Sequence, residues 1–153
     1  MRTAAIVRIL TGAMLIALGW GKAAGDFVKT GFAESTRSMA AETWPFWRHF
    51  LEKVVLPQAG LFAWLVVAGE LAVGIGLVLG LFTRIAAAGG ALLMLSVLLG
   101  TARPASGAEW HEWITAGLTV KFCLLLLVLI LATDPGRVWG LDGRMGRRKP
   151  VRG

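Results

Sequence analysis

The stretch LFAWLVVAGELAVGIGLVLGLFTR, residues 61–84, decides the fold of this chain, because it is almost wholly apolar yet contains one acid. That acid, Glu70, follows nine uncharged residues and precedes a run that stays apolar until Thr83 and Arg84. A helix of about 20 such residues crosses the hydrocarbon core of a bilayer. Lipid offers no hydrogen bonds to the backbone, so a segment that spans it must be helical. The stretch therefore predicts a transmembrane helix with a carboxylate near its middle.

Four stretches of the chain have the apolar length of a membrane span, and they lie at residues 4–21, 59–82, 85–101 and 113–132. The chain has 153 residues, of which 56% are hydrophobic and only 16% are charged. A soluble domain of this length cannot bury that much apolar surface. We therefore predict one all-α domain over residues 1–153, an integral membrane four-helix bundle in contact with the lipid bilayer.

The basic residues gather on one side of the predicted membrane. Five of them lie in the last ten positions, within a tail over residues 134–153, and an even number of spans puts Arg2 and Arg84 on the same side. The positive-inside rule makes that side the cytoplasm, so both termini of this multi-pass protein of the plasma membrane are expected to be cytoplasmic. The net charge of +7 thus indicates topology and contact of the tail with anionic lipid, rather than binding of nucleic acid.

The one long connection, residues 22–58, lies on the outer side between the first two spans. Its second half, PFWRHFLEKVVLP (45–57), has apolar residues at the spacing of an amphipathic helix and a proline at each end. We expect an interfacial helix here that caps the bundle, with a simple filling of the loop as the alternative. Most tryptophans also fall on this outer side, where aromatic rings anchor to head groups.

Charged residues inside a membrane are costly, so Arg8, Lys22, Glu70 and Lys121 need an explanation. Counting 1.5 Å per helical residue puts Glu70 about 16 Å and Lys121 about 12 Å below the outer surface. Arg8 lies about 6 Å from the cytoplasmic edge, close enough to snorkel outward, and Lys22 falls at the outer rim. The depths predict an ion pair between Glu70 and Lys121. Alternatively, Glu70 is protonated and hydrogen-bonded to a hydroxyl or carbonyl group, while Lys121 snorkels outward.

Small residues at four-residue spacing predict the faces on which the helices pack. They are Ala13, Ala17 and Gly21 in the first span, Ala68, Ala72, Gly76 and Gly80 in the second, and Ala86 and Gly90 in the third. The spacing of Gly76 and Gly80 would also suit a contact between two copies of the chain in a homo-oligomer.

The residue inventory restricts the chemistry. A single cysteine, Cys123, excludes an intrachain disulfide, an iron–sulfur cluster and a cysteine-based zinc site. The sequence carries no flavin fingerprint and no histidine within a span to hold haem. His49 and His111, with neighbouring glutamates, would be the only candidates for a metal site, and solvated loop residues are the preferred interpretation. We predict no metal, haem, flavin or iron–sulfur cofactor.

Several short motifs together resemble the DoxX/DoxD family of small four-helix membrane proteins. They are RILTG (8–12), GWGK (19–22), GE (69–70), GLFTRIAA (80–87) and PGRVWGLDGR (135–144). The family includes the small subunit of thiosulfate:quinone oxidoreductase, and other members resemble partners in membrane complexes that handle thiol or oxidative stress. Arg8, Lys22, Glu70 and Arg84 match recurrent polar positions of the family, whereas Lys121 does not.

The resemblance implies a membrane subunit of a quinone-linked oxidoreductase system, similar to thiosulfate:quinone oxidoreductase. Quinone would be the cofactor, with Glu70 and Arg84 as the catalytic residues. An outer pocket near Trp20 and Trp64 would receive the quinone or substrate, with Arg8, Lys22 and Lys121 as further binding residues. The alternative is a non-enzymatic anchor for a soluble redox enzyme or a second redox subunit, and proton or small-molecule permeation is a third reading. Whether the chain is itself an enzyme stays open at this point.

Overall fold

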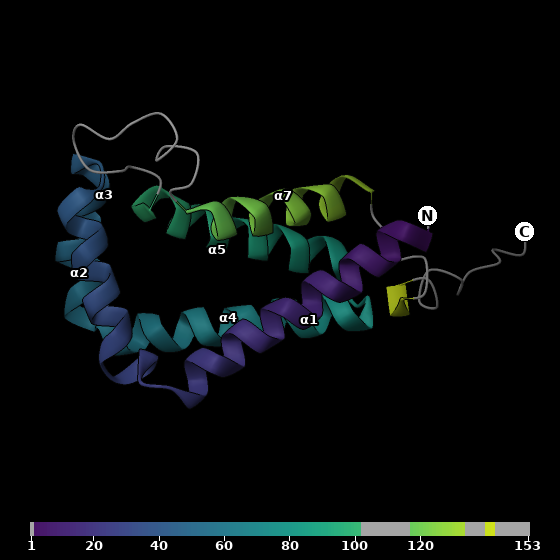
Figure 1. Cartoon of the computed structure of the whole chain (residues 1–153), viewed down its shortest axis with the longest axis horizontal. Helices are drawn as coiled ribbons and strands as arrows, with labels where there is room; N and C mark the ends of the chain where they lie inside the picture. The colour runs from purple at the N-terminus through teal and green to yellow at the C-terminus, as the bar shows by residue number, and fades with distance from the viewer. Residues whose placement is uncertain (1, 102–116, 134–139, 143–153) are drawn as a thin grey trace, which may run out of the picture.

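The computed structural model describes residues 2–101, 117–133 and 140–142, and all regular structure within them is helical. The long helices are α1 (Arg2–Ala24), α4 (Ala59–Leu79), α5 (Thr83–Thr101) and α7 (Leu118–Thr133) (Figure 1). Three helical segments are long and apolar enough to cross a membrane, namely Thr3–Ala24, Pro45–Leu79 and Thr83–Thr101. The predicted all-α membrane helical bundle is confirmed.

The fourth predicted span, residues 113–132, corresponds to α7. This apolar helix has 16 residues and begins at Leu118, so it is shorter than the other spans. Residues 113–116 of the predicted span lie outside the described residues.

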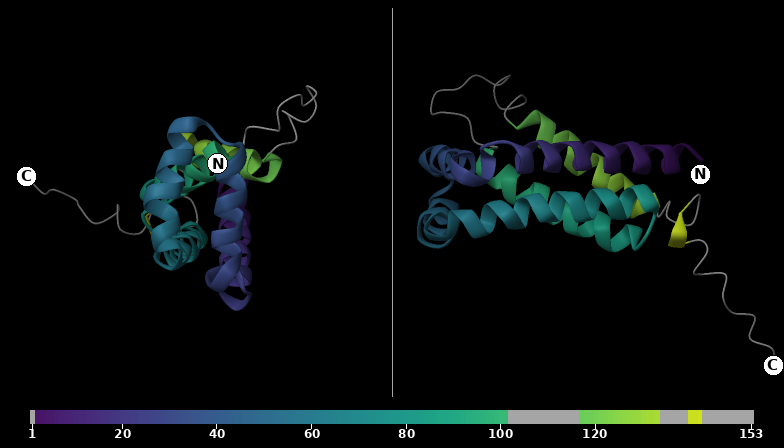
Figure 2. Two further views of the ribbon diagram at one scale, coloured as in Figure 1. Left: turned by 90° about the vertical axis from the view of Figure 1, so that its left-hand side faces the viewer. Right: turned by 90° about the horizontal axis from the view of Figure 1, so that it is seen from below.

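The long helices pack in two pairs, α1 along α4 and α5 along α7, and contact between α4 and α5 joins the pairs. Figure 2 shows α1 and α4 side by side when the bundle is seen from below. The core between the pairs is aliphatic and includes Leu15, Leu77, Leu127 and Ile130, each at most 1% exposed.

The closest approach of α1 and α4 depends on two glycines, Gly12 and Gly74. A Cβ atom on Gly74 would lie 2.7 Å from Cγ1 of Ile16 and 2.8 Å from the Gly12 carbonyl oxygen.

The small-residue face predicted for α1 is wrong, since Ala13 and Ala17 are exposed, and in α4 Ala68 is exposed as well. The prediction is confirmed where α4 meets α5, because a Cβ atom on Gly76 would lie 3.1 Å from Cβ of Ala86 and one on Gly90 would lie 2.8 Å from Cγ1 of Val73. The spacing of small residues therefore indicated the inward face of α5 but not that of α1.

The connection between α1 and α4 is helical almost throughout and covers one end of the bundle, here called the cap end (residues 27–58) (Figure 1). It contains the π-helical turn η1 (Phe27–Gly31), α2 (Phe32–Glu42), α3 (Pro45–Phe50), the π-helical turn η2 (Leu51–Val55) and the 3-10 turn η3 (Leu56–Gln58). Pro45 opens α3 as predicted, because a residue at the first helical position needs no N–H partner. Pro57 does not end the helix, contrary to prediction, because η3 accommodates it and leads directly into α4.

Two polar contacts fasten the cap end. The Arg48 side chain donates from Nε to the Ala40 carbonyl at 2.6 Å and from Nη2 to the Ala41 carbonyl at 2.8 Å. These bonds satisfy carbonyls that the C-terminal end of α2 leaves without helical partners. The buried Thr43 hydroxyl donates to the Leu99 carbonyl at 2.7 Å and ties α2 to the end of α5.

Candidate functional site

Glu70 lies in the middle of α4 with only 2% of its side chain exposed, and its partner is Lys22 at the end of α1. The Lys22 ammonium donates a hydrogen bond to Oε1 of Glu70. The predicted pair of Glu70 with Lys121 is therefore wrong in its cationic partner. A buried ion pair exists, but it joins α4 to α1 and not to α7.

The error in depth has a local cause at Gly19. A Cβ atom on Gly19 would lie 3.2 Å from Cβ of Glu70, so α1 also lies close to α4 at the point where Glu70 emerges. Lys22 stands one turn further along α1 on the same face. Side chains of a helix lean toward its N-terminus, so the Lys22 side chain leans back toward Glu70. Counting residues placed the Lys22 backbone at the rim but ignored this direction.

The second carboxylate oxygen of Glu70, Oε2, is buried and has no hydrogen-bond partner among the described residues. The Lys22 ammonium also lies 5.2 Å from the centre of the Phe27 ring, within range of a cation–π contact. The Lys22 side chain remains 30% exposed. The pair therefore combines a partly exposed cation, Lys22, with a buried hydrogen-bond acceptor, Oε2 of Glu70, that accepts no hydrogen bond from the described residues.

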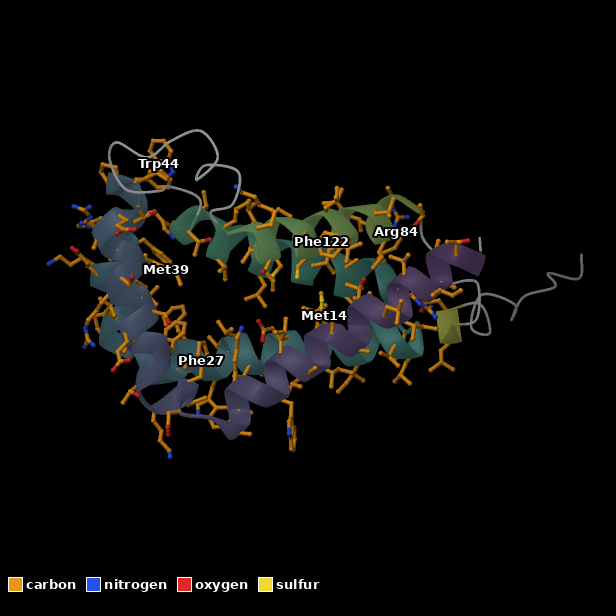
Figure 3. All side chains as sticks on the ribbon, viewed as in Figure 1. Met14, Phe27, Met39, Trp44, Arg84 and Phe122 are labelled. Carbon is orange, nitrogen blue, oxygen red and sulfur yellow. The ribbon has the colours of Figure 1, made fainter. Side chains whose placement is uncertain are left out.

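A pocket of about 360 Å³ lies between the cap end and the bundle. It is lined by apolar and aromatic side chains and by two hydroxyl residues, from α2 (Phe32, Thr36, Met39), α3 and η2 (Trp47, Phe50, Leu51, Val55), α4 (Phe62, Leu65, Val66) and α5 (Leu93, Ser96, Val97). Met39 projects from α2 into this part of the molecule (Figure 3). Its volume and apolar lining are those of a small-molecule site.

The pocket and the ion pair are neighbours along two elements. On α4, Phe62 and Val66 line the pocket, and Glu70 follows Val66 by one turn on the same helix face. On the other side, Phe32 lines the pocket and its ring meets the Phe27 ring edge-to-face, with centroids 5.7 Å apart. Phe27 in turn lies under Lys22. The sequence did not predict this pocket, because one part of its wall comes from α2, for which no helix was expected.

The structure does not bring the other predicted site residues to the ion pair. Trp20 and Trp64 are 68% and 57% exposed and do not line the pocket at the cap end, so their part in ligand binding stays a prediction. Arg84 is exposed in the first turn of α5, at the end of the bundle opposite the cap end (Figure 3). Lys121 lies in the first turn of α7 and takes part in a separate interaction.

Arg8 is fully buried, so the prediction that it snorkels to the membrane edge is wrong. Its guanidinium lies against Gly80, the residue that ends α4 in a left-handed conformation with φ of 62°. A Cβ atom there would come within 2.0 Å of Nη1 of Arg8 and 2.6 Å of Cα of Gly140. Only glycine fits between these groups, and its positive φ is the one that helix C-termini favour.

The same end of the bundle holds a contact that the sequence did not predict, centred on Asp142. Its carboxylate accepts the N–H groups of Phe82 at 2.8 Å and Thr83 at 2.9 Å, and its own N–H donates to the Gly80 carbonyl at 2.9 Å. Asp142 therefore caps the N-terminus of α5 from about 60 residues away in the sequence. We call Arg8, Gly80, Phe82, Thr83, Gly140 and Asp142 the turn cluster. The only signal was the motif GLDG at 140–143, whose aspartate had no assigned role.

The Asp142 carboxylate also stabilises the strained backbone at Phe82. The φ of 49° at Phe82 lies in the left-handed region, which costs a residue with a side chain about 1–2 kcal/mol. Burial raises the pKa of Asp142, but the N–H groups of Thr83 and Phe82 and the charge of Arg8 outweigh it, so the pKa is lowered overall. The ionised carboxylate thus holds a strained turn in place.

A family model described as DoxX matches residues 3–102, which covers α1, the cap end, α4 and α5. No curated protein and no solved structure gave a significant match. The match includes Lys22, Glu70, Arg8 and Gly80, while Asp142 lies beyond it. The chain therefore belongs to the DoxX family and is a multi-pass membrane protein.

Proposed function

We propose that this protein is the membrane subunit of a quinone-linked oxidoreductase system, and that the Lys22–Glu70 pair forms the polar end of its quinone site. The observation that carries the proposal is the buried Oε2 atom of Glu70, which has no hydrogen-bond partner although it lies beside a charged lysine. Leaving a buried acceptor unsatisfied is costly, and such atoms occur in functional sites. An intramembrane acid is itself most often functional.

The residues fit a quinone in their hydrogen-bonding capacity. An ammonium group has three donors, and Lys22 uses one of them on Glu70. The remaining donors suit a carbonyl oxygen, and Oε2 of Glu70 suits a hydroxyl group. A quinone supplies a two-electron, two-proton couple between these carbonyl and hydroxyl forms.

In this proposal Lys22 binds and orients the ring, and Glu70 holds or releases a proton at Oε2. The electrons would be exchanged with a second redox subunit or a soluble enzyme, and thiosulfate is the first reductant to test with that partner. Arg84 lies at the opposite end of the bundle from the cap end, so it would contact that partner or lipid head groups and not the ring. The termini and this end of the bundle would face the cytoplasm at the plasma membrane.

The test is to purify the chain in mild detergent, extract co-purifying quinone, and compare the wild type with Glu70→Gln and Lys22→Met. We expect quinone in the wild type and its loss from both variants. Lys29→Gln is the matched control, because Lys29 forms an exposed ion pair with Asp26 at 3.3 Å on the same side of the molecule. Folded wild type that neither retains nor rebinds quinone would refute the proposal and favour the anchor for a soluble redox partner.

A further inference from the structure

The pocket at the cap end is so apolar that only an apolar ligand, or the apolar part of one, would bind there. Its two hydroxyl groups are already engaged, since Thr36 donates to the Phe32 carbonyl and Ser96 to the Leu93 carbonyl, both at 2.7 Å. No charged side chain lines the pocket. A polar ligand would lose its hydration there without gaining new partners.

We infer that this pocket is a tail-binding site, which takes the hydrocarbon chain of an amphiphile whose polar ring lies at the Lys22–Glu70 pair. The inference rests on the proposed function for the ring, but the pocket has its own evidence. On α4, the lining residue Val66 is one helical turn from Glu70. On the other side, the lining residue Phe32 contacts the Phe27 ring, and that ring contacts Lys22. One ligand can therefore fill the pocket and reach the ion pair.

The size and the walls favour a single chain attached to a ring. A volume of about 360 Å³ is near the lower limit for ligand pockets, which run from about 300 to 1,000 Å³. It suits the first isoprene units of a tail better than the two acyl chains of a phospholipid. Branched isoprene units need an adaptable wall, and Met39 supplies one, since methionine has several rotatable bonds. Leu65, which at 55% is more exposed than the other exposed lining residue, Phe50, marks where the rest of the tail would leave for the bilayer.

The experiment measures quinone binding through the fluorescence of Trp47, which lines the pocket and stacks on Phe50 with centroids 5.0 Å apart. Subtracting the signal of Trp47→Phe isolates this tryptophan from the other six. Two ligands with the same ring are compared, a tail-less benzoquinone and the same benzoquinone carrying an isoprenoid tail. The variant Ser96→Phe fills the pocket, and Ser96→Leu fills it less. The control Leu92→Phe adds bulk on the same helix at a residue that is 70% exposed and does not line the pocket.

We expect the tail to strengthen binding in the wild type and in Leu92→Phe. In Ser96→Phe the tailed quinone should bind at least about tenfold more weakly, the effect of losing roughly two buried methylene groups, while the tail-less quinone binds as before. Ser96→Leu should fall between, and unchanged binding of the tail-less ligand shows that the fold is intact.

Equal affinity of the tailed quinone for wild type and Ser96→Phe would overturn the inference and leave the proposed function standing. Quenching of Trp47 by a brominated phospholipid that the tailed quinone does not displace would overturn it too, and would assign the pocket to an acyl chain. If the wild type binds neither quinone, the proposed function fails and the inference falls with it.

Discussion

The Lys22–Glu70 pair allows a double-mutant cycle that separates it from the alternative partner, Lys121. Replacing Lys22 with methionine leaves a carboxylate that is 2% exposed without its cation. Removing one member of a fully buried pair costs about 3–5 kcal/mol. Because the Lys22 side chain is 30% exposed, water replaces part of the interaction, and we expect a smaller loss of about 2 kcal/mol.

The coupling between the two positions is the decisive quantity. Residues in direct contact couple by about 0.5–3 kcal/mol, whereas separate sites add to within about 0.5 kcal/mol. We therefore expect Glu70→Gln to couple with Lys22→Met by more than about 1 kcal/mol, and to be additive with Lys121→Met.

The assay is reversible unfolding in mixed micelles, in which the free energy of unfolding is obtained for the wild type, the three single variants and the two double variants. Lys121→Met serves as the control, since it removes a lysine from a different helix that makes no ion pair with Glu70. Additivity of Lys22→Met with Glu70→Gln, or a larger coupling through Lys121, would refute the assignment of the pair.

The remaining predictions concern the turn cluster and the cap end. Asp142→Ala should lower the free energy of unfolding by about 0.5–2 kcal/mol through loss of the α5 cap, which denaturant titration can measure. Because folding lowers the pKa of Asp142, the stability that its carboxylate contributes is complete at neutral pH and is lost as the pH falls below about 4. The free energies of unfolding of wild type and Asp142→Asn should therefore converge at low pH, and a difference that persists there would argue against the cap. Gly80→Ala should destabilise the protein by about 1–3 kcal/mol, because Gly80 has a φ of 62° and lies against Arg8. The control Gly89→Ala should be neutral or stabilising, because nothing lies within 4 Å of the added Cβ atom, and equal effects of the two substitutions would contradict the packing. Arg48→Met should cost about 1 kcal/mol by freeing two carbonyls at the end of α2, and unchanged amide exchange in α2 would count against that role.

The cap end shows where reading the sequence succeeded and where it stopped. Pro45 and the spacing of apolar residues after it predicted a helix, and α3 begins at that proline. The helix α2 was missed because it is short and polar on average, and Phe32 and Met39 are its only large apolar residues. Its apolar face is completed only by contact with η2, where Ala40 packs with Leu51 and Val55. The pocket depends on that contact and was missed with it.

The sequence by itself determined that the chain is helical and lies in a membrane, because the length and apolar character of a span follow directly from the thickness of the bilayer and the needs of the backbone. It also determined that Glu70 needs a partner, because an intramembrane charge is costly wherever the helix is placed. Only the tertiary structure decided that the partner is Lys22, because the approach of α1 at Gly19 and the lean of a side chain along its helix do not appear in a count of residues. It likewise decided that Arg8 is buried and that Asp142 caps α5, since both facts arise where three segments far apart in the chain meet at Gly80.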